Sequence, residues 1–165
     1  MKCYDVIIVG AGPAGMTAAI YAVRANMSVL MLDRLSPGGQ IVNTNEIENY
    51  PGSGAVSGAE LAISMFEHTQ ELGVEFDYKT VTSIVDNGEH KTVTCLEESS
   101  TFNAHAVILA TGTMPSKLEV SGEDRFPALV SVGVQFVTEP STVAKMLWLL
   151  VAVTQRLKNP SILPE

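Results

Sequence analysis

Three glycines near the amino terminus, Gly10, Gly12 and Gly15, have the spacing of a turn that receives the diphosphate of a dinucleotide. Glycine permits a tight turn at the first position, close approach of backbone to phosphate at the second, and close packing of helix on strand at the third. A carboxylate, Asp33, follows roughly twenty residues later, where it can hold ribose hydroxyls. Because an acid there disfavours a 2′-phosphate, these residues predict FAD or NAD and not NADP.

A strand, a helix and a second strand are needed to position these groups. The apolar residues 4–9 predict the first strand, residues 14–25 the helix, and residues 28–32 a second strand that ends at Asp33. The start of the helix would face the anion with free N–H groups and the positive end of its dipole.

The next stretch predicts a functional loop. A turn at residues 36–39 leads into the polar residues 40–50, closed by Pro51 and Gly52. A loop of that length in an α/β domain usually has a function. Its neutral side chains suit the edge of a flavin ring or the ribityl chain: Gln40, Asn43, Thr44, Asn45 and Asn49.

The following elements complete one α/β unit. Helical spacing predicts a helix over residues 57–72, stopped by Gly73. Residues 74–85 and 91–96 alternate around a turn at residues 86–88 and predict a small antiparallel meander. Residues 106–109 predict a buried strand that runs into Ala110, Thr111 and Gly112, at the edge where an open α/β sheet meets its ligand.

Composition and charge exclude several classes. The chain has 165 residues, 46% of them hydrophobic, and a formal net charge of −8, which argues against nucleic acid or an anionic membrane as partner. Asp5 and Pro13 interrupt any signal peptide, and the apolar residues 146–153 are too few to span a bilayer. We therefore expect a cytoplasmic protein with no membrane segment and no metal site.

Cysteine usage predicts no redox chemistry in the chain as written. Cys3 and Cys95 are far apart, and each lies in an apolar, strand-like setting that predicts a buried thiol. Neither belongs to a Cys-x-x-Cys pair, so no catalytic residue is predicted.

Four motifs together resemble the small bacterial type of thioredoxin reductase, from the start of the chain to about Ala128. They are residues 4–19, residues 38–40 (Gly-Gly-Gln), residues 47–52 (Ile-Glu-Asn-Tyr-Pro-Gly) and residues 106–112. The first and last occur in many flavoproteins with two dinucleotides, whereas the middle two are more particular. The resemblance implies an α/β, Rossmann-like, three-layer FAD-binding domain with a parallel sheet, helices and a small antiparallel meander, here incomplete.

The resemblance also implies where FAD binds and what the full-length family does. Electrons would pass from NADPH to FAD, then to a Cys-x-x-Cys disulfide in an inserted NADPH domain, and then to thioredoxin; family members are homodimers. Asn45 stands where relatives often have threonine, and Val81 matches the strand that backs the adenine. The implied FAD-binding residues are Gly10, Gly12, Pro13, Ala14, Gly15, Asp33, Arg34, Gly39, Gln40, Asn45, Asn49, Val81, Ala110, Thr111 and Gly112.

Residues 129–165 resemble nothing in the family, and a shifted reading frame explains them. When the third base of each codon joins the first two of the next, the codons for residues 133–139 can encode Cys-Ala-Val-Cys-Asp-Gly. Those for residues 149–153 can encode Val-Gly-Gly-Gly. We therefore expect residues 1–128 to be the first segment of the FAD domain and residues 129–165 to be a frameshift product, caused by loss of one base after the Ala128 codon.

The frameshift interpretation predicts weak or absent FAD retention, poor solubility and no turnover, because the closing segment of the FAD domain would be missing. Two alternatives remain. One is a small FAD- or NAD-binding module that never needed a dithiol, and the other is a flavoprotein like the ferredoxin-NADP reductases, which lack the cysteine pair.

Overall fold

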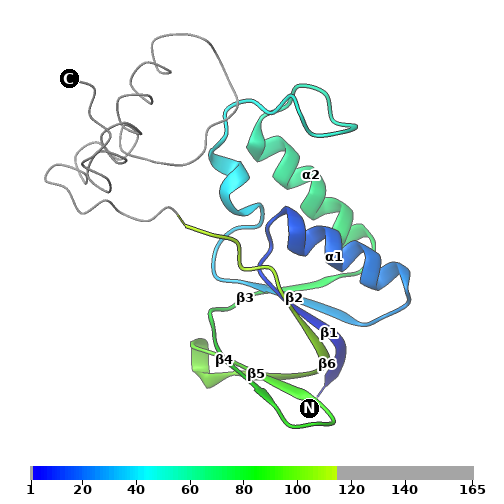
Figure 1. Cartoon of the computed structure of the whole chain (residues 1–165), viewed down its shortest axis with the longest axis vertical. Helices are drawn as coiled ribbons and strands as arrows, with labels where there is room; N and C mark the ends of the chain where they lie inside the picture. Colours follow the sequence, from blue (N-terminus) through cyan, green and yellow to red (C-terminus); the bar gives the residue numbers. More distant parts are fainter. Residues whose placement is uncertain (1, 115–165) are drawn as a thin grey trace, which may run out of the picture. The chain divides into compact units, whose positions relative to one another are not determined.

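The computed structural model describes residues 2–114 (Figure 1). These residues correspond to the first of two units into which the chain divides, Met1–Thr113 and Met114–Glu165. The expected boundary at Ala128, the predicted tail and the apolar residues 146–153 lie outside the described residues. Neither helix in the described part has the length and apolar character needed to cross a membrane.

Six strands form one mixed sheet in the order β3-β2-β1-β6-β5-β4. Strand β1 pairs in parallel with β2 and with β6, and β2 pairs in parallel with β3. The pairs β4–β5 and β5–β6 are antiparallel. The strands are β1 (Cys3–Val9), β2 (Val29–Asp33), β3 (Glu75–Tyr78), β4 (Val81–Asp86), β5 (Lys91–Cys95) and β6 (Thr101–Leu109).

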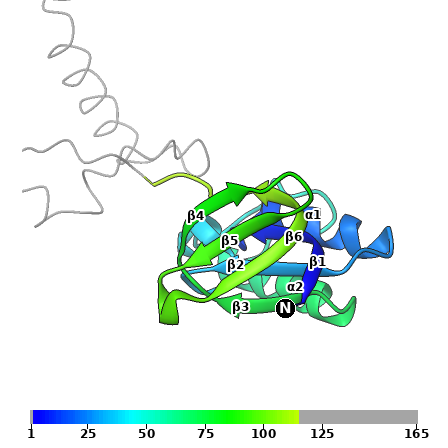
Figure 2. The same ribbon diagram turned by 90° about the horizontal axis from the view of Figure 1, so that it is seen from below.

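Two helices and the β4–β5 hairpin lie on opposite sides of the parallel strands (Figures 1 and 2). Helix α1 (Pro13–Arg24) and helix α2 (Gly58–Glu71) pack side by side, and the 3-10 turns η1 (Gly39–Asn43) and η2 (Glu97–Ser99) lie in the connections. Because β1 and β2 alternate apolar residues on both faces, they contribute to two separate cores. The predicted three-layer α/β fold is confirmed.

One core lies between the parallel strands and the meander, and includes Ile7 and Leu32 with Val93 of β5. The other lies between the strands and the helices, and includes Ile8 and Met31 with Met16 of α1. Residues 6–9 of β1 are buried on both faces, which holds in place the carboxyl end of the strand, from which the glycine turn departs.

Helix α2 begins where the sequence predicts, because Ser57 caps it. The Ser57 hydroxyl accepts the Glu60 N–H at 3.1 Å, and the Glu60 carboxylate accepts the Ser57 N–H at 3.0 Å. This reciprocal capping box satisfies two backbone donors that a helix start otherwise leaves unpaired.

The predicted segment 74–85 is two strands and not one. Its first part is β3, which extends the parallel sheet through the pair Leu30↔Glu75, and only its second part, β4, belongs to the meander. The chain turns between them because Lys79 N–H donates to the Asp33 carbonyl at 2.9 Å and the Glu97 carboxylate accepts the Thr80 N–H. Sequence alternation continues through this corner and does not reveal it.

The prediction of a buried strand at residues 106–109 is wrong in two respects. Strand β6 begins earlier, at Thr101, and Ile108 and Leu109 are 38% and 67% exposed. The physical reason lies in the pairing: β5 covers only residues 101–104, so the second half of β6 is paired on its β1 edge alone within the described chain. The predicted polar loop also contains regular structure, since the 3-10 turn η1 includes its first residues.

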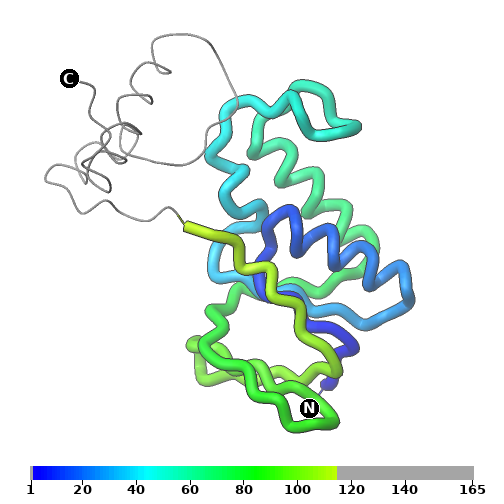
Figure 3. The backbone as a smooth tube through the Cα atoms, viewed as in Figure 1, coloured from blue at the N-terminus to red at the C-terminus, as the bar shows by residue number. Residues whose placement is uncertain are grey.

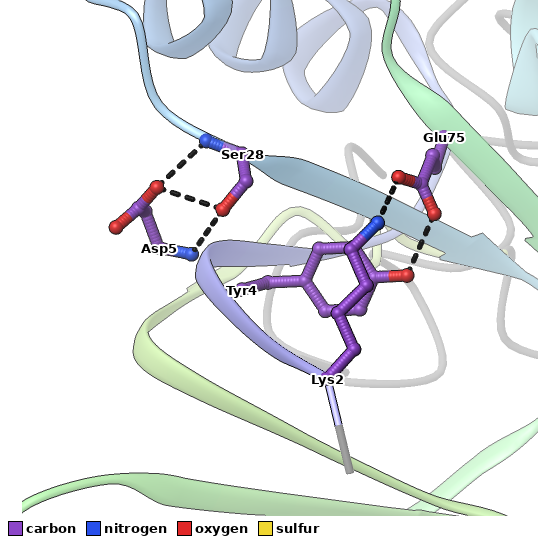
Figure 4. A network of polar contacts seen from close by, with 5 residues as sticks. All are labelled: Lys2, Tyr4, Asp5, Ser28 and Glu75. Atoms are coloured by element: carbon purple, nitrogen blue, oxygen red, sulfur yellow. Dashed lines mark hydrogen bonds and ion pairs between the residues drawn. The ribbon is translucent and has the colours of Figure 1, made fainter.

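Polar contacts join the amino ends of the parallel strands, opposite the end that carries the glycine turn (Figure 4). The Glu75 carboxylate on β3 accepts the Tyr4 hydroxyl at 2.7 Å and pairs with Lys2, whose ammonium lies 4.5 Å from the centre of the Tyr4 ring. The Asp5 carboxylate accepts both the N–H and the hydroxyl of Ser28 at 2.7 Å. These contacts hold the amino ends of β1, β2 and β3 in register.

Candidate dinucleotide-binding site

The glycine turn connects β1 to α1, and two of its glycines are required by neighbouring backbone. Gly10 has φ +109°, and a side chain there would overlap the carbonyl oxygen of Ala110. A side chain on Gly15 would overlap the carbonyl oxygen of Gly10. These two positions therefore set how closely α1 and the end of β6 approach the turn, as the sequence predicts for the third glycine.

Gly12 differs, because no atom beyond its immediate chain neighbours lies within 4 Å of the place a side chain would occupy. It is also the N-cap of α1, where no side chain caps the helix and no acid lies in the first turn. Pro13 follows at the start of the helix, a position at which its missing N–H costs nothing. The helix start is thus open, with uncapped N–H groups and the positive end of its dipole available to an anion.

Asp33 lies at the end of β2, directly beside the turn. Its Oδ2 accepts the Ala11 N–H at 2.7 Å, and its Oδ1 accepts the Leu35 N–H at 3.0 Å. The structure therefore brings the predicted carboxylate to the glycine turn, and it adds a bond to Ala11 that sequence reasoning missed. No spacing rule signals that bond, which depends on how β1 and β2 are aligned.

The Gly-Gly-Gln motif reaches the same turn from the other side. Gly38 N–H donates to the Ala11 carbonyl at 2.8 Å, and a side chain on Gly39 would come 3.4 Å from the Gly12 Cα. Gln40 follows in η1 and is exposed. Gly38 was not a predicted site residue, although its place in the motif was the available signal.

The motif at residues 106–112 also meets the turn, since the Ala110 N–H donates to the Val9 carbonyl at 2.8 Å. Figure 3 follows this end of the chain past the start of α1. Thr111 and Gly112 continue from it and are exposed. Three segments distant in sequence thus converge at one end of β1.

The remaining predicted residues lie farther along the loop or in the meander. Asn45 and Asn49 are exposed in the connection from η1 to α2, which is closed by a bridge between Ile47 and Val56. Val81 begins β4 and packs against the core cluster that contains Val9 and Leu32. Among the described residues, neither Asn45 nor Asn49 makes a hydrogen bond to the glycine turn.

The two thiols do not form a reactive pair. Cys95 is buried on β5, and burial raises its pKa, with a smaller contribution from the Glu97 charge. Cys3 is exposed at the start of β1, so the prediction that both thiols are buried is wrong for Cys3. Cys3 is the first residue of β1, and the strand is buried on both faces only from Val6 onward. The described residues contain no cluster able to hold a metal ion.

Residues 4–142 match the family model for pyridine nucleotide-disulphide oxidoreductases. The thioredoxin reductase of Bacillus subtilis is 49% identical over 122 residues, which cover 74% of this chain and 38% of that protein. That of Listeria monocytogenes is 49% identical over 123 residues, with the same coverage.

Among solved structures, Lactococcus lactis thioredoxin reductase is 47% identical with a TM-score of 0.70, covering 76% of this chain and 41% of that one. The chain thus spans about two fifths of the length of these relatives. The predicted resemblance is confirmed, and it implies FAD as the dinucleotide. By sequence, fold and the assembled glycine turn, the chain belongs to the pyridine nucleotide-disulphide oxidoreductase family and corresponds to the first part of its thioredoxin reductases.

Proposed function

We propose that the described residues bind the ADP half of FAD at the glycine turn. The observation that carries this proposal is the open N-cap at Gly12, where no atom fills the space beside an uncapped helix start. The diphosphate would lie there, with the first-turn N–H groups of Ala14 and Gly15 as donors and the Asp33 carboxylate on the ribose side.

We assign the flavin half to residues nearer the polar loop. Gly39 lies next to Gly12 and Gln40 follows it in η1, so we propose that a cofactor extending from the turn meets these residues first. Further proposed contacts with FAD as a whole, including Val81 on the adenine side, come from the family resemblance alone. They are Pro13, Arg34, Asn45, Asn49, Val81, Ala110, Thr111 and Gly112.

For the whole protein from which this segment comes, we propose thioredoxin-disulfide reductase activity. When bound, FAD would supply two-electron chemistry: it would accept electrons from NADPH and pass them to a disulfide, and the dithiol so formed would reduce thioredoxin. We also propose a cytoplasmic homodimer. The 165 residues contain only Cys3 and Cys95, so this chain has no dithiol with which to complete that transfer.

We propose that residues 129–165 are read out of frame. The shifted codons can supply both Cys-Ala-Val-Cys-Asp-Gly and a later glycine motif. Coincidence does not readily place two family motifs in the same shifted frame. Sequencing the DNA across the codons for residues 128–134 tests this directly. If the codons cannot supply TGT or TGC at the two required junctions, the frameshift interpretation is wrong.

Titration of the 165-residue chain with ADP and with FAD tests the binding proposal. Because the groups that we propose to hold ADP lie within the described residues, we expect ADP to bind, and FAD to bind weakly and compete with it. We expect no NADPH-dependent reduction of thioredoxin. Folded protein that binds neither nucleotide would contradict the proposal.

The second candidate is a flavin- or NAD-binding module without a dithiol, including a ferredoxin-NADP reductase-like flavoprotein. The wide separation of Cys3 and Cys95 favours it. It predicts that the codons after Ala128 cannot encode the cysteine pair, so the DNA sequence separates the two candidates. It also predicts yellow purified protein that releases flavin on denaturation.

A further inference from the structure

Ala11, between the first two glycines, is completely buried, and its two backbone polar groups are bonded to the last residue of β2 and to the loop that follows it. Its N–H donates to Asp33 Oδ2 at 2.7 Å, and its carbonyl accepts the Gly38 N–H at 2.8 Å. The other Asp33 oxygen accepts the Leu35 N–H at 3.0 Å. One carboxylate therefore joins the glycine turn to the first residues after β2.

This bonding decides the direction of the Gly12 N–H. In a trans peptide the carbonyl and the following N–H point in opposite directions, and the described chain contains no cis peptide. Because the Ala11 carbonyl points to Gly38, the Gly12 N–H points away from that loop. Apart from its immediate chain neighbours, no atom lies within 4 Å of the place a Gly12 side chain would occupy, so the space beside Gly12 is open.

The partner segment is itself held in place. Gly38 has φ +117°, and a side chain there would come 2.5 Å from the Ala62 Cβ of α2 and 2.6 Å from the Val42 Cγ1. Asp33 is fixed at the end of a β2 strand that pairs with β1 and β3. Both groups that orient Ala11 thus belong to packed elements.

We infer that Asp33 is a positioning residue that orients the glycine turn before any nucleotide binds. This role is additional to the ribose contact that the sequence predicts, and it rests on the proposed nucleotide binding at this turn. The Asp33 carboxylate orders the Gly10–Ala11 peptide, the Gly38 N–H orders the Ala11–Gly12 peptide, and together they direct the Gly12 N–H toward the diphosphate.

Amide hydrogen exchange of Ala11 in the nucleotide-free 165-residue chain is the first test. We expect slow exchange in the parent and exchange about tenfold faster in Asp33→Asn, because a neutral amide with one acceptor oxygen would replace a charged carboxylate that accepts two N–H groups. Asp5→Asn is the matched control, because Asp5 also accepts a backbone N–H but lies at the other end of β1. Unprotected Ala11 in the parent would overturn the inference, even if the variant fails to fold.

Nucleotide affinity is the second test, with ADP and with 2′,3′-dideoxyadenosine diphosphate, which lacks both ribose hydroxyls. A positioning role predicts that Asp33→Asn weakens both ligands, each by about tenfold. Removing a negative charge beside an anion would by itself strengthen binding, so the sign of the effect separates positioning from simple electrostatics.

The two ligands also separate this inference from the proposed function. If Asp33→Asn leaves the dideoxy ligand's affinity unchanged or raises it, Asp33 acts through the ribose or through charge, and the positioning role is wrong. If the parent binds neither ligand, the proposed function fails, while the Ala11 exchange rates still decide whether Asp33 orders the turn.

Discussion

Substituting alanine at Gly15 and at Gly12 separates packing from ligand access within one turn. At Gly15 the new methyl group would overlap the carbonyl oxygen of Gly10, a backbone atom that cannot rotate away. Overpacking of this kind costs up to about 3 kcal/mol, and the better helix propensity of alanine returns about 1 kcal/mol. We therefore expect Gly15→Ala to lower the free energy of unfolding by about 2 kcal/mol.

Gly12→Ala should leave the free energy of unfolding within about 0.5 kcal/mol of the parent. Its φ of −77° and ψ of 179° suit any residue, and no atom beyond the immediate chain neighbours lies within 4 Å of the added methyl group. The poorer N-cap of alanine, about 0.5 kcal/mol, is offset by a similar loss of unfolded-state entropy. The added methyl group instead occupies the space proposed for the diphosphate, so ADP affinity should fall.

Urea unfolding followed by circular dichroism measures both variants in the 165-residue chain, with ADP titration alongside. In a parallel thermal unfolding experiment, a loss of 2 kcal/mol corresponds to a fall in Tm of about 10 °C for a unit of this size. If Gly15→Ala unfolds at the parent's midpoint, or Gly12→Ala is destabilised as much as Gly15→Ala, the assignment of these two glycines is wrong.

Three further outcomes follow from the described contacts. Hydrogen bonds from Ser28 and Thr80 hold the pKa values of Asp5 and Glu97 below their usual range, so their stabilisation is present at neutral pH. This stabilisation is lost as pH falls below about 4, so the urea midpoint should drop there. A urea midpoint that stays constant down to about pH 3 would contradict this. Iodoacetamide should modify one thiol per native chain, Cys3, and two after denaturation, whereas two in the native chain would show that Cys95 is accessible. Ser57→Ala should lower the free energy of unfolding by about 1 kcal/mol, and an unchanged midpoint would show that the capping box contributes nothing.

The sequence by itself determined the local elements and the kind of ligand. Glycine spacing, the apolar runs on either side and an acid after the second run specify a β-α-β turn, because each depends only on neighbours along the chain. The start of α2 was equally predictable, since Ser57 and Glu60 interact within one helical turn. The family followed from four short motifs for the same reason.

Only the tertiary structure decided which segments meet. The break between β3 and β4 depends on bonds from Lys79 to Asp33 and from Thr80 to Glu97, partners that alternation along the chain does not encode. The exposure of Leu109 depends on how far β5 extends along β6. Asp33 became a partner of Ala11 because β1 and β2 align in parallel, which places the end of one strand beside the turn that leaves the other.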